Sequence, residues 1–409
     1  DLIGEARNST SDSWEQADVR EAQRLHEKAR KLPPTLVSEL ARTTSLAYDA
    51  WVAARRDSDF PAFAPWLTRI LDLKRREAEC LRIGETPYDA LLDEYEEGTT
   101  QAHLHQVFSR LRPLLTGLLK RILQSGKQPR PELLTGHYPA EKQEQFGRQV
   151  LTAMGFDWNS GRLDRSPHPF CAGLTPSDVR ITTRYREEDF TVAIFGIIHE
   201  GGHALYEQGL DTERYGLPAT TTVSLGIHES QSRLWENQVG RSPSFWGHWY
   251  PVLQNAFPGQ LDRLSLEEFL RGINRVDAGL IRVEADEVSY GLHVILRFEL
   301  ERELLAGNLE VAELDERWNQ LMEEFLEEQE KDQRKTTWEF FETERLSLFT
   351  INDESFNQYQ REALEALTAQ RRRIRLESYV AKQIQNGAKI NDEEKFRNSV
   401  TDQQLGPDK

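Results

Sequence analysis

The sequence has very little cysteine: Cys80 and Cys171 are the only two cysteines among its 409 residues. Two cysteines cannot build a disulfide framework, and no Cys-x-x-Cys pair is present that could bind a metal or carry out redox chemistry. Such scarcity is typical of proteins from a reducing compartment. Because no signal peptide is recognisable either, we expect a cytoplasmic protein.

Long apolar runs and an excess of positive charge are also missing. No run approaches the roughly 18 consecutive apolar residues that a membrane span needs. The net charge is −17 and is spread along the chain, which disfavours binding to nucleic acid or to anionic membranes. The short run Arg371-Arg372-Arg373 is interpreted as a solvated helix face. We therefore expect neither a nucleic-acid partner nor a membrane partner.

The sequence is rich in helical periodicity. Over residues 1–150 apolar side chains recur every three or four positions, as in "VREAQRLHEKARKL", which predicts successive amphipathic helices. Turn residues are more frequent after position 150, and a minor β element is expected near 178–186. Further helices are predicted between the caps Asp189 and Gly209, over 223–240 and over 281–307. The fold class is therefore mostly α.

The composition changes after residue 326. From Glu327 to Thr337 there is no apolar residue, and a helical pattern resumes only later. We therefore divide the chain into a helical domain over 1–326 and a C-terminal helical segment over 327–409, whose end is expected to be frayed.

The stretch "FTVAIFGIIHEGGHALYEQGL" carries the strongest chemical signal. His199 and His203 are four positions apart, so on a helix both imidazoles can reach one ion, and Glu200 lies beside them. In His-Glu-x-x-His the histidines bind zinc and the glutamate is the general base. The plainer alternative is a core helix with two satisfied histidines. Such a helix gains nothing from Gly201 and Gly202, which destabilise a helix interior by roughly 1 kcal/mol each.

A third ligand is needed, because zinc hydrolases use three protein ligands and keep one position open. Glu229 lies 26 positions after His203, on the next predicted helix, and is the expected third ligand. Glu236 and His228 are weaker rivals. Alternatively, Glu229 is an exposed carboxylate that pairs with Arg233 four positions along the helix.

Several motifs occur together and in a fixed order: "HPF" from His168, "DVRIT" from Asp178, "HEGGH", "HESQSRLWENQ" and "LIRVEAD" from Leu280. With these motifs the chain resembles the carboxypeptidase Taq family of metal-dependent carboxypeptidases over about residues 1–325. The resemblance implies a large helical fold with two lobes around a deep substrate groove, like angiotensin-converting enzyme and neurolysin. It also implies zinc, with cobalt as a substitute, and a homodimer.

The resemblance implies a role for each matching residue. His199, His203 and Glu229 become metal ligands and Glu200 the catalytic base. Arg282 becomes the residue that binds the C-terminal carboxylate of the substrate, although it could instead pair with Asp286 on its own helix. Four further residues are expected in the groove or behind the ligands: His168, Asp178, Arg180 and His228.

One family motif is not found here. Family members carry a glycine-led stretch that ends Asp-x-His-Trp, followed by an aromatic segment, and this region closes the groove in relatives. After His293 the chain has no histidine, and Tyr359 and Tyr379 are its only later tyrosines. We expect residues 327–409 not to reach the metal.

The resulting prediction is a zinc carboxypeptidase that removes single residues, with broad specificity, from peptides with a free C-terminus. Two alternatives stay open. One is an endo-acting zinc oligopeptidase, which would not need Arg282 to read a carboxylate. The other is a catalytically impaired zinc-binding pseudoenzyme that serves as a peptide-binding scaffold, because the last motif is missing.

Overall fold

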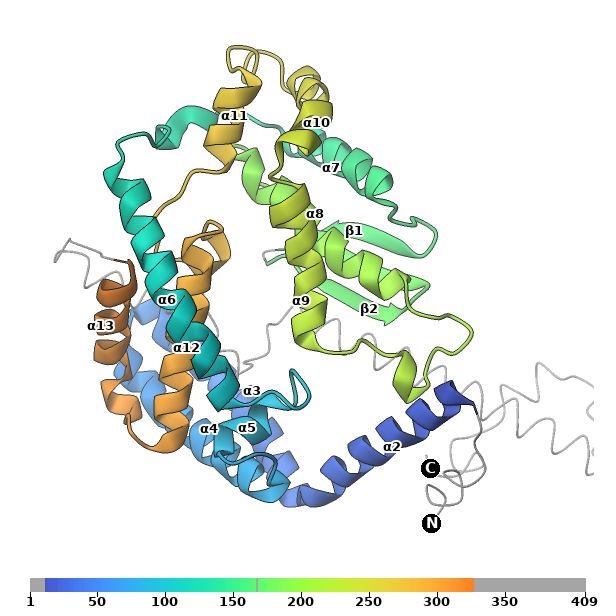
Figure 1. The fold of residues 1–409 in the computed structure, drawn as a ribbon, viewed down its shortest axis with the longest axis vertical. Coiled ribbons are helices and arrows are strands. Elements are labelled where there is room, and N and C mark those ends of the chain that lie inside the picture. Colours follow the sequence, from blue (N-terminus) through green and yellow to red (C-terminus); the bar gives the residue numbers. More distant parts are fainter. Residues whose placement is uncertain (1–11, 167, 327–409) are drawn as a thin grey trace, which may run out of the picture. The chain divides into compact units, whose positions relative to one another are not determined.

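The computed structural model describes residues 12–166 and 168–326 (Figure 1). The predicted C-terminal helical segment, its frayed end, Tyr359 and Tyr379 lie outside the described residues. Among the described helices, none combines the length and the apolar composition that a bilayer crossing requires.

The described chain is mostly helical, as predicted. Successive helices fill residues 13–154, where the sequence showed repeated amphipathic periodicity. The α-helices are α2 (Ser13–Lys31), α3 (Pro34–Asp57), α4 (Phe60–Leu81), α5 (Pro87–Leu92), α6 (Gln101–Gln124), α7 (Ala140–Met154), α8 (Phe190–Gln208), α9 (Leu225–Arg233), α10 (Pro243–Ala256), α11 (Leu266–Ile273), α12 (Ser289–Ala306) and α13 (Leu314–Leu326). Short helical turns are η1 (Pro131–Leu134), η2 (Pro218–Thr220), η3 (Leu234–Val239), η4 (Arg282–Glu284) and η5 (Val311–Glu313).

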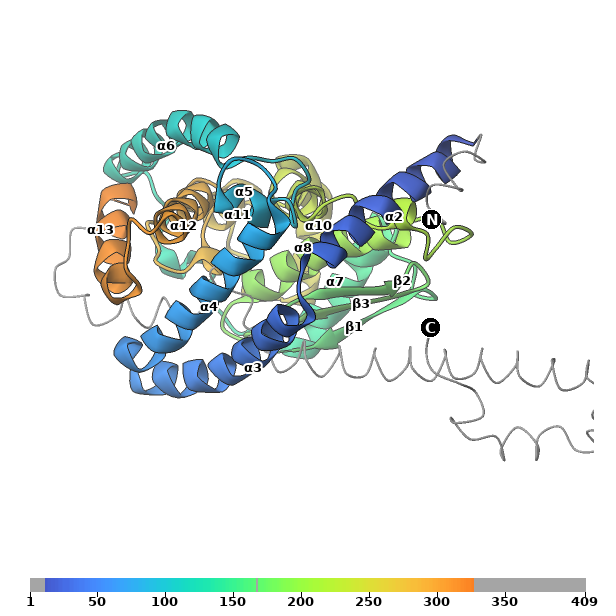
Figure 2. The same ribbon diagram turned by 90° about the horizontal axis from the view of Figure 1, so that it is seen from below.

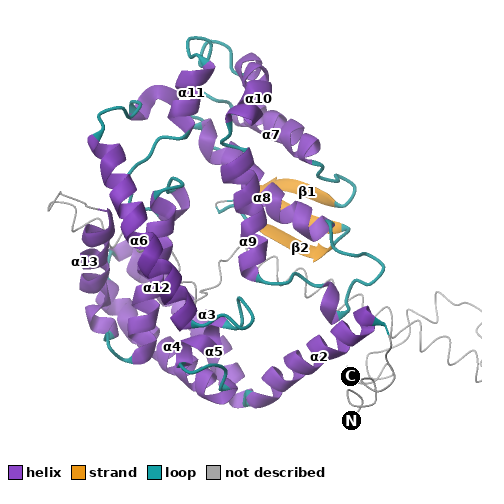
Figure 3. Ribbon diagram, in the orientation of Figure 1, coloured by secondary structure: helices purple, strands orange, loops and turns teal. Residues whose placement is uncertain are grey.

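A three-stranded sheet interrupts the helices (Figure 3). Its strands are β1 (Gly161–Arg165), β2 (Cys171–Thr175) and β3 (Asp178–Thr183), in the order β1-β3-β2. β1 runs parallel and β2 antiparallel to β3. Only β3 was predicted. The sequences of β1 and β2, "GRLDR" and "CAGLT", contain too few apolar residues to alternate, so their strand structure depends on pairing with β3.

The buried apolar side chains form three clusters. One is built by α3, α4, α5, α6, α12 and α13, with α3 and α4 side by side (Figure 2). A second joins α7, α8, α10 and α11, and a third joins the sheet to α7 and α8. Helix α8 takes part in two of them, with Ile194 and Ile198 in one and Ile197 in the other. A helix buried on two sides holds its side chains in fixed directions.

Helix α8 begins and ends where the sequence predicts. The Asp189 side chain accepts a hydrogen bond from the backbone nitrogen of Thr191, and Gly209 is the C-cap. Predicted helix 223–240 is also helical, but it consists of α9, capped by Ser224, followed by the π-helical segment η3. π-Helical turns inside helices are rare and are frequent at functional sites.

The predicted helix over 281–307 is wrong in its first part. Arg282 lies in the short turn η4, and α12 begins only at Ser289. The cause is Asp286, whose carboxylate accepts hydrogen bonds from the backbone nitrogens of Val288 and Ser289 and so starts a new helix. Arg282 and Asp286 are therefore not one turn apart on a common α-helix, which removes the premise of the proposed helical pair.

Candidate metal centre

The two glycines of "HEGGH" are explained by close packing around α8. A Cβ atom on Gly202 would lie 2.7 Å from Cα of Ser232 and 2.8 Å from the carbonyl oxygen of Gln231, both in α9. A Cβ atom on Gly201 would lie 2.6 Å from a methyl group of Leu151. Only glycine allows the backbones of α8 and α9 to approach this closely. This approach brings α9 against the histidines of α8.

Three side chains from these two helices converge. Oε2 of Glu229 lies 3.7 Å from Nε2 of His199 and 3.3 Å from Nε2 of His203. One ligand atom of each residue lies within 4.8 Å of the others, and in the described part of the chain this is the one group of three such side chains that could hold a metal ion. Two imidazole nitrogens and a carboxylate oxygen are a common zinc donor set in hydrolases, and an ion between them could reach all three at about 2.0–2.2 Å.

The second oxygen of Glu229 is also engaged. Oε1 accepts a hydrogen bond from Nε of Arg233 at 3.1 Å. The pairing with Arg233, which was the alternative to a ligand role, and the position beside the histidines therefore occur together. Partial burial disfavours a charge on Glu229, but the hydrogen bond with His203 and the charges of His199 and Arg233 hold its pKa well below its usual range. Glu229 is therefore an ionised ligand candidate.

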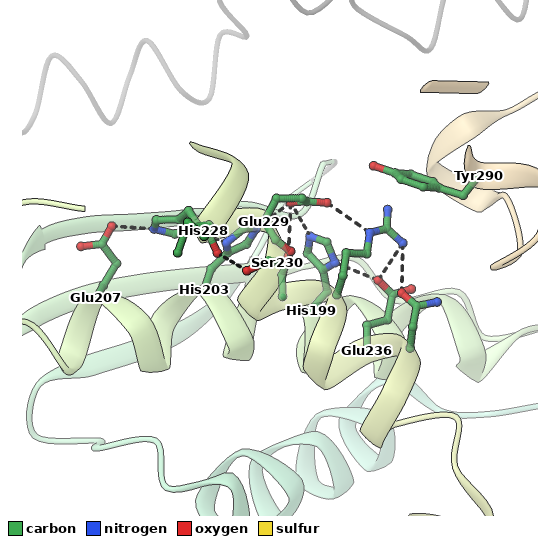
Figure 4. A network of polar contacts seen from close by, with 12 residues as sticks. His199, His203, Glu207, His228, Glu229, Ser230, Glu236 and Tyr290 are labelled. Atoms are coloured by element: carbon green, nitrogen blue, oxygen red, sulfur yellow. Dashed lines mark hydrogen bonds and ion pairs between the residues drawn. The ribbon is translucent and has the colours of Figure 1, made fainter. Parts of the chain in front are cut away.

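The rival ligands contact the other side of each imidazole ring (Figure 4). Oε2 of Glu236 lies 2.8 Å from Nδ1 of His199, and Nδ1 of His228 lies 2.5 Å from Nδ1 of His203. Histidines that bind metals through one nitrogen almost always donate a hydrogen bond through the other. Glu236 and His228 are placed to accept these hydrogen bonds, and both Nε2 atoms are left for an ion.

The environments of the two histidines differ. Burial lowers the pKa of a histidine, but at His199 the hydrogen bond with Glu236 and the neighbouring carboxylates outweigh this effect and raise the pKa. At His203 burial dominates and the pKa is lowered. The Glu236 carboxylate is itself contacted by Nη1 of Arg233 at 3.2 Å and Nη2 of Arg241 at 3.7 Å.

Glu200 is almost completely buried, with a relative exposure of 6 %. Burial is the main cause that raises the pKa of its carboxyl group to about 7. A carboxyl group that titrates near neutrality can both accept and return a proton, which is what a general acid–base catalyst needs. A cation bound beside it would lower this pKa.

A cavity of about 460 Å³ opens over these groups. Glu200 and Glu229 line it together with Arg282. The predicted catalytic base, the predicted third metal ligand and the residue expected to bind the substrate carboxylate therefore face one cavity. Nη1 of Arg282 donates a hydrogen bond to the Tyr290 hydroxyl at 3.2 Å. The other lining residues are His168, Pro169, Arg184, Arg186, Asp189, Thr191, Val192, Phe195, Gly196, His199, Arg233, Glu236, Arg241, Val283, Ala285 and Tyr290.

Two predicted residues lie elsewhere. Asp178 and Arg180, both on β3, pair with each other through two hydrogen bonds of 3.0 Å, and neither lines the cavity. Both residues lie on the strand that packs on α8, outside the lining of this cavity.

Sequence reasoning missed several contacts of this site. Glu207 contacts His228 at 2.8 Å and could have been found, because it lies one turn after His203 on the same helix. The Arg233 guanidinium stacks 3.6 Å from the centre of the Tyr290 ring. No local signal predicts this contact, since Tyr290 comes from α12.

Comparison with known proteins places these residues in a family context. The sequence model of the carboxypeptidase Taq (M32) metallopeptidases matches residues 1–336. Thermostable carboxypeptidase 1 of Thermus thermophilus is 47 % identical over 310 residues, which are 74 % of this chain and 61 % of the relative. Carboxypeptidase 1 of Bacillus subtilis is 39 % identical over 326 residues, 80 % and 65 % of the two chains. The chain thus spans less than two thirds of the length of these relatives.

Solved structures of carboxypeptidases are similar to this chain as well. The M32 carboxypeptidase from Deinococcus radiodurans superposes with a TM-score of 0.78 at 38 % identity, over 86 % of this chain and 72 % of that one. Metallocarboxypeptidase 1 of Trypanosoma cruzi gives a TM-score of 0.78 at 34 % identity, over 97 % and 77 %. The similarity therefore extends through the fold as well as through the motifs.

Proposed function

The chain belongs to the carboxypeptidase Taq (M32) family of metallopeptidases, and from this premise we propose that it is a zinc-dependent carboxypeptidase. It would remove single C-terminal residues, with broad specificity, from peptides with a free C-terminus. The observation that carries the proposal is the convergence of His199, His203 and Glu229 beside the buried Glu200.

The proposed roles follow from the positions of the side chains. His199 Nε2, His203 Nε2 and Glu229 Oε2 would hold the ion, which supplies Lewis acidity for the activation of water near neutral pH. Glu200 would accept a proton from the attacking water and return it to the leaving amine. Arg233 would keep the carboxylate of Glu229 ionised and oriented through its contact with Oε1.

Substrate recognition is assigned to Arg282. An exopeptidase must bind a carboxylate next to the scissile bond, and a guanidinium offers two parallel hydrogen bonds to it where an ammonium offers a point charge. Arg282 lines the same cavity as Glu200 and Glu229, which supports this role. His168 lines that cavity too and is proposed as a groove residue.

Family membership supports further proposals. We propose zinc as the metal, with cobalt as a substitute, a homodimer as the assembly and the cytoplasm as the location. The two-lobed groove like that of angiotensin-converting enzyme and neurolysin belongs to the same set. Nucleic acid and membranes are not among the proposed partners, which fits the net charge of −17.

The test is metal analysis of the purified chain together with hydrolysis of a blocked dipeptide that has a free C-terminus. One zinc ion per chain and chelator-sensitive release of the C-terminal residue are expected. Zinc binding without hydrolysis would favour the impaired, peptide-binding alternative. Cleavage that is equally fast on the C-terminally amidated dipeptide would favour the endo-acting alternative.

A further inference from the structure

The side chains of His228 and Glu207 form a chain of polar contacts with His203. Nδ1 of His203 lies 2.5 Å from Nδ1 of His228, and Nε2 of His228 lies 2.8 Å from Oε1 of Glu207. Figure 4 shows the three side chains in a row that leads away from Glu229. The row therefore begins at a candidate metal ligand and ends at a carboxylate.

The hydrogen bonds of this row fit only one arrangement of protons when His203 binds an ion. Nε2 of His203 must then be free of a proton, so Nδ1 carries it. Nδ1 of His203 can donate only if Nδ1 of His228 accepts, which places the proton of His228 on Nε2. That proton points at Glu207, which accepts it. Each of these nitrogen and oxygen atoms is thus defined as a hydrogen-bond donor or as an acceptor.

The three side chains come from two adjacent helices, and a glycine on the neighbouring strand leaves space for Glu207. Glu207 lies one turn after His203 on α8, and His228 comes from α9. Opposite Glu207, strand β2 presents Gly173, where a Cβ atom would lie 2.4 Å from Cδ of Glu207. The side chains of His228 and Glu207 are only 14 % and 16 % exposed, so water competes little for their hydrogen bonds.

The support of His203 differs from that of His199. His199 contacts a carboxylate directly, at Glu236, whereas His203 contacts a second imidazole and reaches a carboxylate only through it. We propose that His228 and Glu207 are positioning residues that fix the Nδ1 proton and the ring orientation of His203, and thereby set the affinity of the site for its metal ion. This proposal rests on the proposed zinc site.

The test measures the Kd for Zn²⁺ by competition with a chromophoric chelator. His228→Phe keeps an aromatic ring but removes both nitrogens, and it should raise the Kd about 10- to 100-fold, the usual effect of losing such a partner. His248→Phe is the matched control, because His248 is an exposed histidine on α10 that meets the Trp249 ring edge to face. It should leave the Kd unchanged.

Two further variants separate positioning from a general loss of structure. His228→Gln offers a side-chain carbonyl oxygen to Nδ1 of His203 and should recover part of the affinity that His228→Phe loses. Glu207→Gln retains an acceptor but loses the charge, so it should weaken zinc binding less than His228→Phe does. The exposed Glu213 gives the matched control, Glu213→Gln.

The melting temperature of the metal-free protein completes the design. If His228 is a positioning residue, its substitution should change the Kd for Zn²⁺. The metal-free His228→Phe and His228→Gln variants should then have the same melting temperature as the parent. An unchanged Kd in His228→Phe would overturn the proposal. So would a Kd that rises only together with a fall in this melting temperature and is not recovered by His228→Gln. Should the parent chain itself bind no zinc, the proposed metal site fails, and that result is distinct from either of these.

Discussion

A Cβ atom on Gly202 would lie 2.7 Å from Cα of Ser232. This distance is shorter than any ordinary contact between two carbon atoms. Cα of Ser232 is a backbone atom and the position of a Cβ atom is fixed by its own backbone, so neither atom could rotate away. The close spacing of α8 and α9 therefore requires that residue 202 has no side chain. The approach of Glu229 to the histidines depends on this spacing.

Gly202→Ala should destabilise the protein and weaken zinc binding. Helix propensity alone would favour alanine by up to about 1 kcal/mol, but forcing the helices apart should cost about 1–3 kcal/mol, as overpacking usually does. Gly117→Ala is the control, because Gly117 lies inside α6 and a Cβ atom there would meet nothing within 4 Å. Denaturant unfolding should show opposite signs for the two variants. A stabilised Gly202→Ala protein would contradict the packing argument.

Glu200→Gln should keep the metal and lose most turnover. The amide has nearly the same size but cannot accept a proton from water, and general base catalysis typically contributes about 10²- to 10⁴-fold to the rate. Zinc content and kcat are measured on the same preparation. Loss of zinc in proportion to activity would make Glu200 a structural residue or a ligand instead of the base.

Arg282→Ala should lower kcat/KM for peptides with a free C-terminus by at least about 10-fold, the effect of one charge-assisted contact. Peptides amidated at the C-terminus should be poor substrates of the parent and lose little more in the variant. If the variant handled both kinds of peptide like the parent, Arg282 would have a structural role, to which its hydrogen bond with Tyr290 belongs, and would not bind the substrate carboxylate.

Stability should fall in mild acid because of His293. Its side chain is 1 % exposed, and burial, with Arg297 and Arg282 nearby and Asp286 opposing them, lowers its pKa to about 4. The unfolded chain takes up the proton near pH 6.5 and the folded chain only near pH 4. The contribution is therefore complete above pH 6.5 and is lost as the pH falls towards 4, by about 2–3 kcal/mol at pH 4.5.

His293→Gln removes this titration and can keep the hydrogen bond to the carbonyl oxygen of Gly279. Urea unfolding of parent and variant at pH 7 and pH 4.5 gives the comparison. The difference in unfolding free energy between the two pH values should be smaller in the variant. Equal differences would show that His293 titrates normally in the folded protein.

Local patterns predicted the features that depend on neighbours in sequence. The spacing of His199 and His203 fixes their common helix face, and Asp189 marks where that helix begins. Strand β1 could not be predicted in this way, because it is held by parallel pairing with β3 and by the burial of Leu163 in the cluster beneath the sheet. The stacking of Arg233 on Tyr290 likewise joins distant elements. The late start of α12 was missed although Asp286, its cause, is visible in the sequence.

The central proposal is that this chain is a metal-dependent exopeptidase that acts from the C-terminus. The most direct measurement is mass spectrometry of an unblocked decapeptide during incubation with the zinc-loaded protein. We expect a ladder of products that lose one C-terminal residue at a time, and we expect a chelator or the Glu200→Gln substitution to abolish it. Fragments from internal cleavage, or an intact peptide in the presence of a fully zinc-loaded chain, would contradict it.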